Sequence, residues 1–555
     1  MSGDPLPDEV AEPAALAREV ARLGYVLDDE QVGAMRAAVV AAEPAIAALR
    51  ARPVPLDGDA DPAHGDRWPR TPVRVRERGS GGAASDDGDP EGVGGLLVAF
   101  AAGSSTPDRA VADALARLRT THAALNSTIR FLDERATRAA EESTRRWAQG
   151  RPRPLEGVPF GVKDVIDVAG VPTTAGSWCH GDAPAAASAT VVRRLEEAGA
   201  IPVSKDATTE FAVGGPRPPR FGAVRNPWDA GRWAGGSSTG SAAAVAARAL
   251  PFALGTDVGG SVRLPSAWCG LTGLKPTAGA IPRTGVFPLS WTAESVGPLT
   301  RSAADAERLF ALLRGPDGAD PRAGELPPFA PEDRRDLAGL RVGVLGGEVT
   351  AFCDADVRAG VDAVVGHLAA AGADVVAAEL PSGAAALAIG YEIVFAEAAT
   401  LHRLDPDHGD RWDRYDPVTV RRISQGITTP AVDYLRALQF RAELQRELDA
   451  VLADVDLLVT PTCPSTAPWL PETGSDATVV VDGERFPLYA AQSRTTMIAN
   501  LTGAPALALP SGFAADGCPT SVQFVGRPHD EATLLAVARV VQDRTDHHRR
   551  SPSPT

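Results

Sequence analysis

Apolar residues recur at helical spacing in two regions of the N-terminal part of the chain. Between Pro13 and Arg52, Ala, Leu and Val repeat in ALAREVARLGYVL and in EQVGAMRAAVVAAEPAIAALRAR. A second region contains RAVADALARLRTTHAAL and the run from Phe131 to Ala148, where apolar stripes lie opposite Arg and Glu. This spacing is typical of amphipathic helices. It predicts a small helical unit at the N-terminus and further helices beyond it.

Short β-rich runs alternate with helical patterns in the rest of the chain. ATVVRRLEEAGA precedes IPVSK, and RVGVL, DVRAGVDAVVGHLAAAGA and DVVAAEL follow one another as strand, helix and strand. Three late runs, VDLLVTP, APALALP and TSVQFVG, each close on Pro or Gly and precede the amphipathic DEATLLAVARVVQ. Such alternation predicts an α/β fold with a mixed, largely parallel sheet covered by helices.

The composition between Leu56 and Gly95 differs from that of its neighbours. Gly, Pro, Asp and Ser dominate there and bulky apolar residues are few, which is typical of a flexible linker. No second linker of this kind divides the rest, although the short proline-rich GELPPFAPEDRR offers another boundary. We therefore expect a helical N-terminal appendage over residues 1–55, a flexible linker over 56–95, a single α/β domain over 96–544 and a disordered tail over 545–555.

Charge and hydropathy restrict the classes of partner. The 555 residues include 55 Lys and Arg against 71 Asp and Glu, a formal net charge of -16, and the isoelectric point is near 5.1. An acidic chain is a poor ligand for a phosphate backbone, so we expect no nucleic acid partner. The sequence has no uncharged apolar run of about eighteen residues, and MSGDPLPDEV is acidic where a secretory signal is basic. We expect a cytoplasmic protein with no membrane partner.

Cysteine and histidine patterns indicate neither a disulfide framework nor a metal site. The five cysteines are odd in number and form no CxxC pair, and the histidines show no HxxxH or HxH spacing. Reduced, buried thiols fit this pattern. We therefore expect no metal and no organic cofactor.

Three polar residues in glycine-rich surroundings are candidates for catalysis. They are Lys163 in GVPFGVKDV, Ser237 in AGGSSTGSAAAVAA and Ser261 in ALGTDVGGSVRLPSAWCG. A serine is a weak nucleophile unless a neighbouring base takes its proton, and that base is usually histidine. No histidine lies between His180 and His367, so a lysine is the nearer candidate base.

Ser261 follows an apolar run that ends in two glycines. Glycines let the backbone approach a substrate carbonyl closely, because they carry no Cβ. Amides that point at a developing oxyanion stabilise it by about 3 kcal/mol per donor in other enzymes. A plain Gly-Gly-Ser turn also explains this segment when it is taken alone. The candidate oxyanion donors are the backbone amides of Val258, Gly259, Gly260 and Ser261.

Ser237 and Lys163 each have a structural explanation beside the catalytic one. Ser237 precedes an alanine-rich run that favours a helix, so it suits a helix N-cap. Lys163 ends the β-like VPFGVK, and most such lysines lie at the surface with their stems on the core. To act as a base Lys163 must be neutral, and burial favours the neutral form because it lowers the lysine pKa.

Two other motifs compete for the same glycines. Gly235 to Gly240 fits G-x-x-x-x-G, but Ser241 stands where a phosphate-binding loop needs lysine. Gly236 to Gly240 also fits G-x-S-x-G, with Ser238 as the nucleophile of an α/β-hydrolase. That motif needs a preceding strand, whereas NPWDAGRWA is loop-like, and it needs a downstream histidine. The candidate histidines are His402, His408 and His529.

Taken together, the segments are similar to the amidase signature family. GGSSTGSAAAVAA and ALGTDVGGSVRLPSAWCGLTGLKPT form almost the whole signature block, and the interval from Ser237 to Ser261 (261 minus 237, or 24) fits it. Further similarity runs through EGVPFGVKDVIDVAGVPTTAGS, VRNPWDAGRWAGG, SVGPLTRSAADAERL and ANLTGAPALALPSGF. The resemblance covers about Val98 to Gln542 and implies the amidase signature fold over that range.

The resemblance also implies a Ser-cisSer-Lys triad. Ser261 would attack the amide carbonyl and form an acyl-enzyme. Ser237, which in this family follows a cis peptide bond, would relay the proton, and Lys163 would act as the base. The expected activity is hydrolysis of a carboxamide to a carboxylate plus ammonia or an amine, with a small-molecule linear amide as substrate and a bond other than a peptide bond cleaved.

Two departures from the family pattern concern the pocket. Thr239 stands where the family usually has glycine, so the local turn differs or Thr239 lines the pocket. Glu294 and Ser295 stand where relatives often have Asp and His. None of the three removes a member of the expected triad, so these changes concern the shape of the substrate.

Two alternatives to a stand-alone amidase stay open. The chain could be the glutaminase subunit of a tRNA-dependent amidotransferase, or a catalytically silent binding protein with the same fold. Substrate-selecting residues are not identified by the sequence. Candidate loops are VGGPRPPRF near Val213 and HGDRWDRYDPVTVRRI near His408, whose Arg and aromatic residues suit a carboxylate, a ring or a solvated helix face. A homodimer is also open as its assembly.

Overall fold

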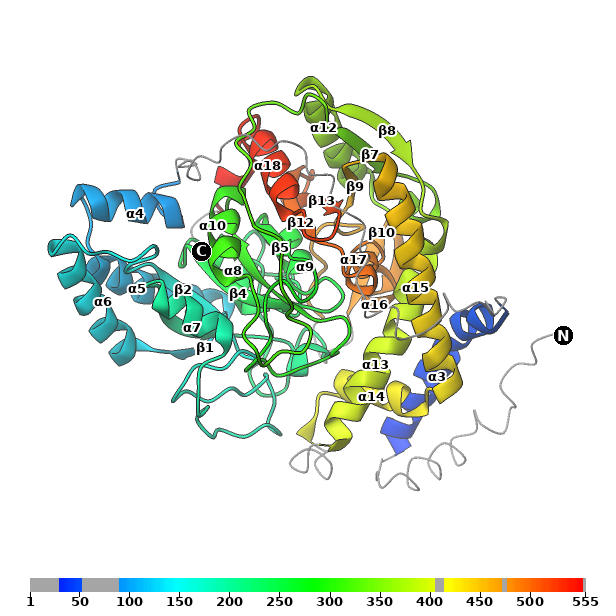
Figure 1. Ribbon diagram of the computed structural model, residues 1–555. Coiled ribbons are helices and arrows are strands. Elements are labelled where there is room, and N and C mark those ends of the chain that lie inside the picture. The colour runs from blue at the N-terminus through cyan, green and yellow to red at the C-terminus, as the bar shows by residue number, and fades with distance from the viewer. Residues whose placement is uncertain (1–28, 52–88, 405–413, 472–476, 553–555) are drawn as a thin grey trace.

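The computed structural model describes residues 29–51, 89–404, 414–471 and 477–552 (Figure 1). The expected linker therefore lies outside the described residues from position 56 to 88, and so does His408. Of the expected tail, residues 545–552 are described. They include the short helix η6 (His547–Arg549), whose Arg549 carbonyl accepts a hydrogen bond from Arg248 Nη2 at 2.8 Å.

A mixed sheet of eleven strands forms the centre of the molecule. A separate two-stranded sheet consists of β10 (Thr478–Val481) and β11 (Glu484–Pro487). In spatial order the strands of the large sheet are β1 (Thr128–Phe131), β3 (Ile201–Asp206), β2 (Pro159–Lys163), β4 (Phe252–Asp257), β6 (Ser295–Thr300), β5 (Thr272–Lys275), β12 (Ala506–Phe513), β13 (Pro519–Gly526), β9 (Leu457–Pro461), β7 (Arg341–Leu345) and β8 (Asp374–Ala378).

The α/β fold and the mixed sheet confirm the prediction, but parallel pairing is less extensive than expected. It is confined to β3–β2–β4 and to β9–β7–β8. The six remaining pairs, β1–β3, β4–β6, β6–β5, β5–β12, β12–β13 and β13–β9, are antiparallel. A helical crossover returns a strand parallel to its neighbour, whereas the short turn between β12 and β13 reverses the chain.

Helices cover both faces of the sheet, and the apolar runs of the sequence become its buried strands. Along β4, Phe252 and Leu254 enter one apolar core while Ala253 enters another, as the alternation of side chains along a strand requires. The described helices are α3 (Asp29–Ala51), α4 (Val93–Ala102), α5 (Pro107–Leu125), α6 (Asp133–Ala148), α7 (Thr190–Glu197), α8 (Thr239–Ala246), α9 (Arg263–Cys269), α10 (Ala303–Leu313), α11 (Glu348–Ala351), α12 (Ala355–Ala370), α13 (Ala386–Leu404), α14 (Pro417–Thr428), α15 (Ala431–Asp454), α16 (Leu488–Ala491), α17 (Thr496–Thr502) and α18 (Glu531–Gln542).

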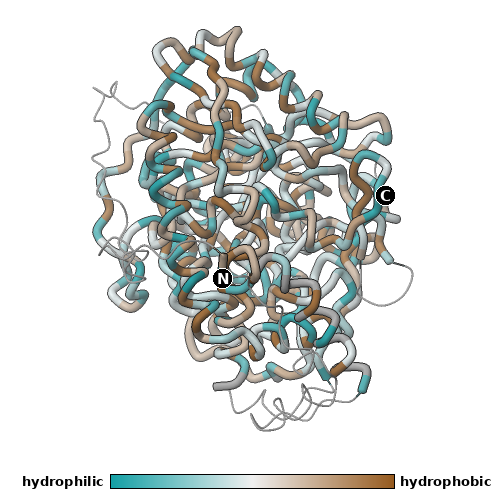
Figure 2. The backbone as a smooth tube through the Cα atoms, turned by 90° about the vertical axis from the view of Figure 1, so that its right-hand side faces the viewer, coloured by the Kyte–Doolittle hydropathy of each residue, from teal (hydrophilic) through white to brown (hydrophobic). Residues whose placement is uncertain are grey.

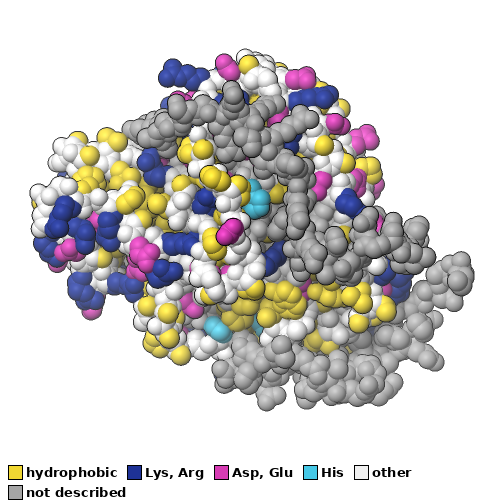
Figure 3. Space-filling model, viewed as in Figure 1, with side chains coloured by type: hydrophobic (Ala, Val, Ile, Leu, Met, Phe, Trp, Pro, Cys, Tyr) yellow, Lys and Arg dark blue, Asp and Glu magenta, His cyan; other side chains and the backbone are white. Residues whose placement is uncertain are grey.

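The two faces of the sheet have separate cores. Residues of α10, α12 and α18 join one core with alternate residues of the strands, and residues of α5, α6 and α8 join the other. Figure 2 shows hydrophobic and hydrophilic positions alternating along the helices, and Figure 3 shows Lys and Arg side chains gathered over the lobe that contains α5 and α6. These helices therefore present apolar stripes to the sheet and charged faces to solvent.

Helices α13, α14 and α15 form a third layer beside the sheet. Helix α13 contacts both α14 and α15, and α13 and α15 share an apolar cluster with α17. The segment Pro381–His402 is the one described helical stretch with the length and hydropathy of a membrane span, and 61% of that stretch is buried inside the fold. Its apolar composition thus serves packing between helices in this structure.

The stacked rings of Phe160 and Phe252 join β2 to β4, with centroids 5.2 Å apart and an interplanar angle of 4°. We expect Phe160→Ala to lower the free energy of unfolding by about 3–5 kcal/mol, because it leaves a cavity between two fully buried strands. Phe160→Leu keeps most of the volume and should cost less than about 1.5 kcal/mol. Urea unfolding followed by fluorescence compares the two variants; equal losses would contradict this account of the contact.

Candidate active site

Lys163 and Thr256 meet where two parallel strands end. β2 ends at Lys163, β4 ends one residue after Thr256, and the two strands pair in parallel. Parallel strands bring their carboxyl ends to the same edge of a sheet. Lys163 is fully buried there, and its Nζ lies 2.7 Å from Ser237 Oγ and 2.8 Å from Thr256 Oγ1.

The environment of Lys163 favours its neutral form. Burial lowers the pKa of Lys163 to about 7, although Glu294 and Asp257 oppose the shift. Glu294 is itself fully buried, and burial raises its pKa to about 7 against the influence of Arg283 and Lys163. Glu294 Oε1 has no hydrogen-bond partner among the described residues. Near neutral pH both groups therefore gain or lose a proton readily.

Ser237 follows a cis peptide bond. The bond between Gly236 and Ser237 is cis, which is the geometry that the resemblance implies. The alanine-rich run after it forms α8, as its helix propensity predicts. Thr239 begins this helix, donates a hydrogen bond to the Ala207 carbonyl at 3.0 Å and is absent from the pocket wall among the described residues. Its β-branched side chain therefore anchors the helix start and does not shape the pocket.

Ser261 lies in a tight turn between β4 and α9. Gly260 in this turn has φ +121°, and a Cβ at this position would lie 2.5 Å from Thr496 Oγ1. The Asp257 carboxylate accepts hydrogen bonds from the backbone N–H groups of Gly260 at 2.8 Å and Val262 at 3.1 Å. Only glycine fits this conformation without strain, so the turn holds Ser261 in one place.

The turn leaves three of the four predicted oxyanion donors available. The N–H groups of Val258, Gly259 and Ser261 have no hydrogen-bond partner among the described residues. The Gly260 N–H, in contrast, already donates to Asp257 Oδ1. We therefore correct the expected donor set by removing Gly260, because a single N–H engaged with a buried carboxylate is not free to bind an oxyanion.

A buried ion pair, which the sequence did not reveal, supports the turn. Arg263 donates to Asp257 through Nε at 3.0 Å and Nη2 at 2.8 Å, and both side chains are fully buried. Asn500 Nδ2 also donates to Asp257 Oδ1 at 2.9 Å. Burial alone would raise the pKa of Asp257, but Arg263 holds it well below its usual range. The signal was an Asp and an Arg six positions apart in an otherwise apolar and glycine-rich run.

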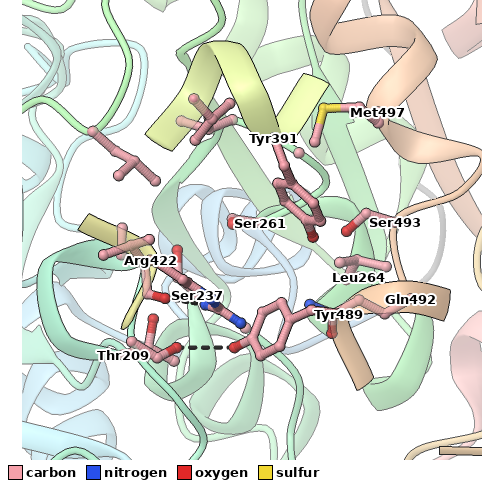
Figure 4. Close-up of a pocket in the computed structure, with 18 of the residues that line it drawn as sticks. Thr209, Ser237, Ser261, Leu264, Tyr391, Arg422, Tyr489, Gln492, Ser493 and Met497 are labelled. Carbon is pink, nitrogen blue, oxygen red and sulfur yellow. Dashed lines mark hydrogen bonds between the residues drawn. The ribbon is translucent and has the colours of Figure 1, made fainter. Parts of the chain in front are cut away.

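Both serines line one pocket, whose empty space is about 480 Å³ when the open solvent at its mouth is included. Ser237, Ser261, Val258 and Gly259 lie on its floor, and residues of α13, α14, α16 and α17 or next to them complete its wall. Figure 4 shows Ser237 and Ser261 around the same open space as Arg422 and Tyr391. The Ser261 side chain is half-buried and faces this space without a hydrogen bond to any described residue.

Arg422 is the one charged side chain among the described residues that line this pocket. It belongs to VTVRRI, part of the segment that the sequence marks as a candidate for substrate binding. Arg422 Nη1 donates to the Val213 carbonyl, the guanidinium lies over the Tyr489 ring, and Tyr489 in turn donates to the Gly214 carbonyl at 2.9 Å. Its Nη2 is buried and has no hydrogen-bond partner among the described residues, and no described carboxylate forms an ion pair with it.

The G-x-S-x-G alternative does not match the geometry. Ser238 is fully buried, lies outside the pocket lining and donates to the Thr256 carbonyl at 3.4 Å. His402 bonds to Tyr415, and the backbone of His529 bonds to Thr277, so neither described histidine contacts Ser238. The segment before Gly236 is a loop, as expected. An α/β-hydrolase elbow centred on Ser238 is therefore not formed by the described residues.

No cluster of three or more His, Cys, Asp or Glu side chains that could hold a metal ion occurs among the described residues. All five cysteines are buried free thiols. Among the described residues, the pocket lining offers hydroxyls, backbone amides, the Gln492 carboxamide and a guanidinium, and the Lys163 amine contacts Ser237.

The sequence and the fold match known proteins over most of the chain. The family described as Amidase matches residues 109–535. One of the subunits of glutamyl-tRNA(Gln) amidotransferase from Chloroflexus aggregans is 36% identical over 480 residues, which cover 82% of this chain and 96% of that one. The AtzE subunit of 1-carboxybiuret hydrolase from Pseudomonas sp. (strain ADP) is 35% identical over 454 residues, covering 81% and 97%.

A solved structure has a similar fold over most of this chain. It is a protein complex described as revealing the evolutionary origins of an s-triazine catabolic enzyme, and it matches with a TM-score of 0.76 at 32% identity, covering 82% of this chain and 98% of that one. The family match over residues 109–535 contains all eleven strands of the large sheet and the serine-rich signature block. The chain belongs to the amidase signature family of hydrolases.

Proposed function

We propose that this protein hydrolyses a small carboxamide through an acyl-Ser261 intermediate, with Ser237 as proton relay and Lys163 as base. The observation that carries the proposal is the 2.7 Å contact between Lys163 Nζ and Ser237 Oγ, placed behind a pocket that both serines line. A lysine pKa lowered by burial to about 7 supplies a base at neutral pH. A serine that relays to such a base needs no histidine.

In the first half-reaction, Ser261 Oγ attacks the amide carbonyl carbon. Its proton moves to Ser237 while the Ser237 proton moves to Lys163, which becomes an ammonium. The oxygen of the tetrahedral intermediate accepts hydrogen bonds from the free N–H groups beside Ser261. Lys163 then returns a proton through Ser237 to the leaving nitrogen, the carbon–nitrogen bond breaks, and ammonia or an amine departs.

In the second half-reaction, water takes the place of the amine. Lys163 receives a water proton through Ser237 while the hydroxide attacks the Ser261 ester. Collapse of the second tetrahedral intermediate breaks the bond to Ser261 Oγ, which regains its proton from the relay. The carboxylic acid leaves and gives its proton to solvent or to the released amine, which yields the carboxylate, and Lys163 is neutral again.

The pocket favours an acyl group that carries an anion. Among the described residues, buried Arg422 has no hydrogen-bond partner for Nη2 and no carboxylate that forms an ion pair with it, and a buried cation gains most from a ligand that neutralises it. A free amino acid such as glutamine also carries an ammonium group. The described pocket wall has no Asp or Glu to bind an ammonium. This supports a carboxylate-bearing amide without an amino group, in preference to the glutaminase alternative suggested by the amidotransferase relatives.

Removal of the nucleophile is the first test. We expect Ser261→Ala to lower kcat by about 10⁵-fold or more and Lys163→Ala by about 10³-fold or more, because each removes a member of one relay. Ser238→Ala, a neighbouring buried serine outside the pocket, should keep kcat within about tenfold of the native value. Mass spectrometry should find an acyl adduct on Ser261; loss of activity in Ser238→Ala alone would favour the hydrolase elbow instead.

The pH dependence tests the role of Lys163. As pH rises through about 7 the neutral fraction of Lys163 increases, so kcat/KM should rise on an acid limb near that pH. An anionic Glu294 stabilises the lysine ammonium, so Glu294→Gln should lower the Lys163 pKa and move the limb to lower pH. Glu142→Gln, on the exposed side of α6, should leave it in place. An upward or absent shift in Glu294→Gln would refute this electrostatic link.

Substrate choice tests Arg422. We expect succinamate to be hydrolysed with a KM at least about tenfold lower than that of its neutral methyl ester, and Arg422→Gln to abolish this preference. Because Arg422 acts on binding, kcat should change less than KM. Half-buried Arg421→Gln, one position earlier in the same helix and outside the pocket lining among the described residues, serves as the matched variant and should retain the preference. A native enzyme that prefers glutamine to succinamate would overturn the assignment of substrate class.

A further inference from the structure

The N-terminal helix α3 docks on the helical layer that builds one wall of the pocket. It contacts α13, α14 and α15, and Figure 1 shows it alongside these helices, far from its neighbour in sequence, α4. The matched family region begins at residue 109, so α3 lies outside the part of the chain that defines the family. The contact therefore joins an addition to the architecture that the family shares.

Apolar side chains form the first part of this contact. Val32, Ile46 and Leu49 are the buried residues of α3 whose side chains are described, and they lie on one helical stripe. Leu49 belongs to the apolar cluster that also contains Ile393 of α13 and Phe440 of α15. Docking of α3 thus buries a surface of the helical layer together with its own apolar stripe.

An ion pair forms the second part. Arg50 donates to Asp433 through Nε at 3.1 Å and Nη2 at 2.7 Å, and the Asp433 side chain is only 1% exposed. Arg436 Nη2 also donates to the Leu49 carbonyl at 3.0 Å near the end of α3. Within the described residues, Arg50 supplies the ion-pair partner of Asp433. Loss of α3 would leave this buried carboxylate without its cation, which is costly.

The charges of Asp433 and Arg50 act on Glu392, which lies on a helix that reaches the pocket wall. Glu392 of α13 is buried and accepts hydrogen bonds from Gln425 Nε2 at 3.1 Å and Thr429 Oγ1 at 3.0 Å, which ties α13 to the end of α14. Burial raises the pKa of Glu392, Asp433 adds to the rise, and Arg50 opposes it. The same α13 and α14 carry Tyr391 and Arg422 into the pocket.

We propose that α3 is a built-in accessory partner, a tethered helix whose docking on α13, α14 and α15 holds the Arg422 wall in its substrate-binding position. Lys163, Ser237 and Ser261 belong to other elements, β2 and the turns before α8 and α9, which α3 does not support. Undocking of α3 therefore weakens substrate binding more than it slows chemistry, a coupling between two separate sites. The expected effect of α3 on substrate binding and turnover rests on the proposed amidase function.

The experiment uses the full chain with a specific protease site inserted between Ser80 and Gly81. After cleavage of the native protein, the N-terminal fragment should co-elute with the remainder in size-exclusion chromatography. Leu49→Asp combined with Arg50→Asp should release it, because both parts of the contact are removed. Val40→Asp is the matched control, since Val40 is 54% exposed on the same helix, and it should leave the fragment bound.

Two readouts follow release of the fragment. Hydrogen exchange in residues 417–428 should rise at least about tenfold, because α14 loses its support. KM for succinamate should rise at least about tenfold while kcat stays within about threefold, and excess fragment added back should restore the native KM. A native fragment that separates on cleavage, a double variant whose fragment stays bound, or release without change in exchange would each overturn the proposal.

These outcomes remain separable from the proposed function. Co-elution and hydrogen exchange require no turnover, so they decide whether α3 supports α14 even if the native chain hydrolyses no amide. An inactive native chain would refute the amidase proposal alone. A kcat that falls as far as substrate binding weakens would show that α3 supports the whole fold and not the pocket wall.

Discussion

The buried ion pair between Asp257 and Arg263 is the interaction on which the site depends. Asp257 ends a central strand, and its carboxylate accepts from the backbone of the turn that carries Ser261 as well as from Arg263. One carboxylate therefore shapes the turn and links it to α17 through Asn500. Removing either charge would leave the other buried and unpaired, so the turn and the pair form together.

The cost of burying a charge also explains the pKa shifts of Lys163 and Asp257. Lys163 is placed by strand pairing at an edge where it loses water, and this desolvation is what lowers its pKa. Asp257 experiences the same desolvation but is compensated by Arg263, so it stays ionised. Lys163 and Asp257 are thus both buried at the ends of paired strands, yet Lys163 favours its neutral form and Asp257 stays charged. Among the described residues, only Asp257 of the two forms an ion pair.

Much of the fold follows from local patterns, whereas the site depends on contacts between distant segments. The helix after Ser237 and strands such as RVGVL were predictable, since alanine propensity and β-branched runs act locally. The family resemblance predicted Lys163, Ser237 and Ser261 as site residues. The engagement of the Gly260 N–H, the place of Arg422 and the docking of α3 were not predictable, because each depends on a partner far away in sequence or on the exact path of a turn. The antiparallel centre of the sheet was missed for the same reason.

The burial of the cysteines affects how this protein reacts with electrophiles. All five thiols are buried, and burial raises the pKa of Cys269, Cys353, Cys463 and Cys518. Thiols held in this state are poor nucleophiles, since the thiolate is the reactive form. A serine-directed probe, such as a fluorophosphonate, would therefore meet little competition from sulfur in the native protein. Burial of sulfur leaves the pocket hydroxyls as the place where covalent labelling can be selective.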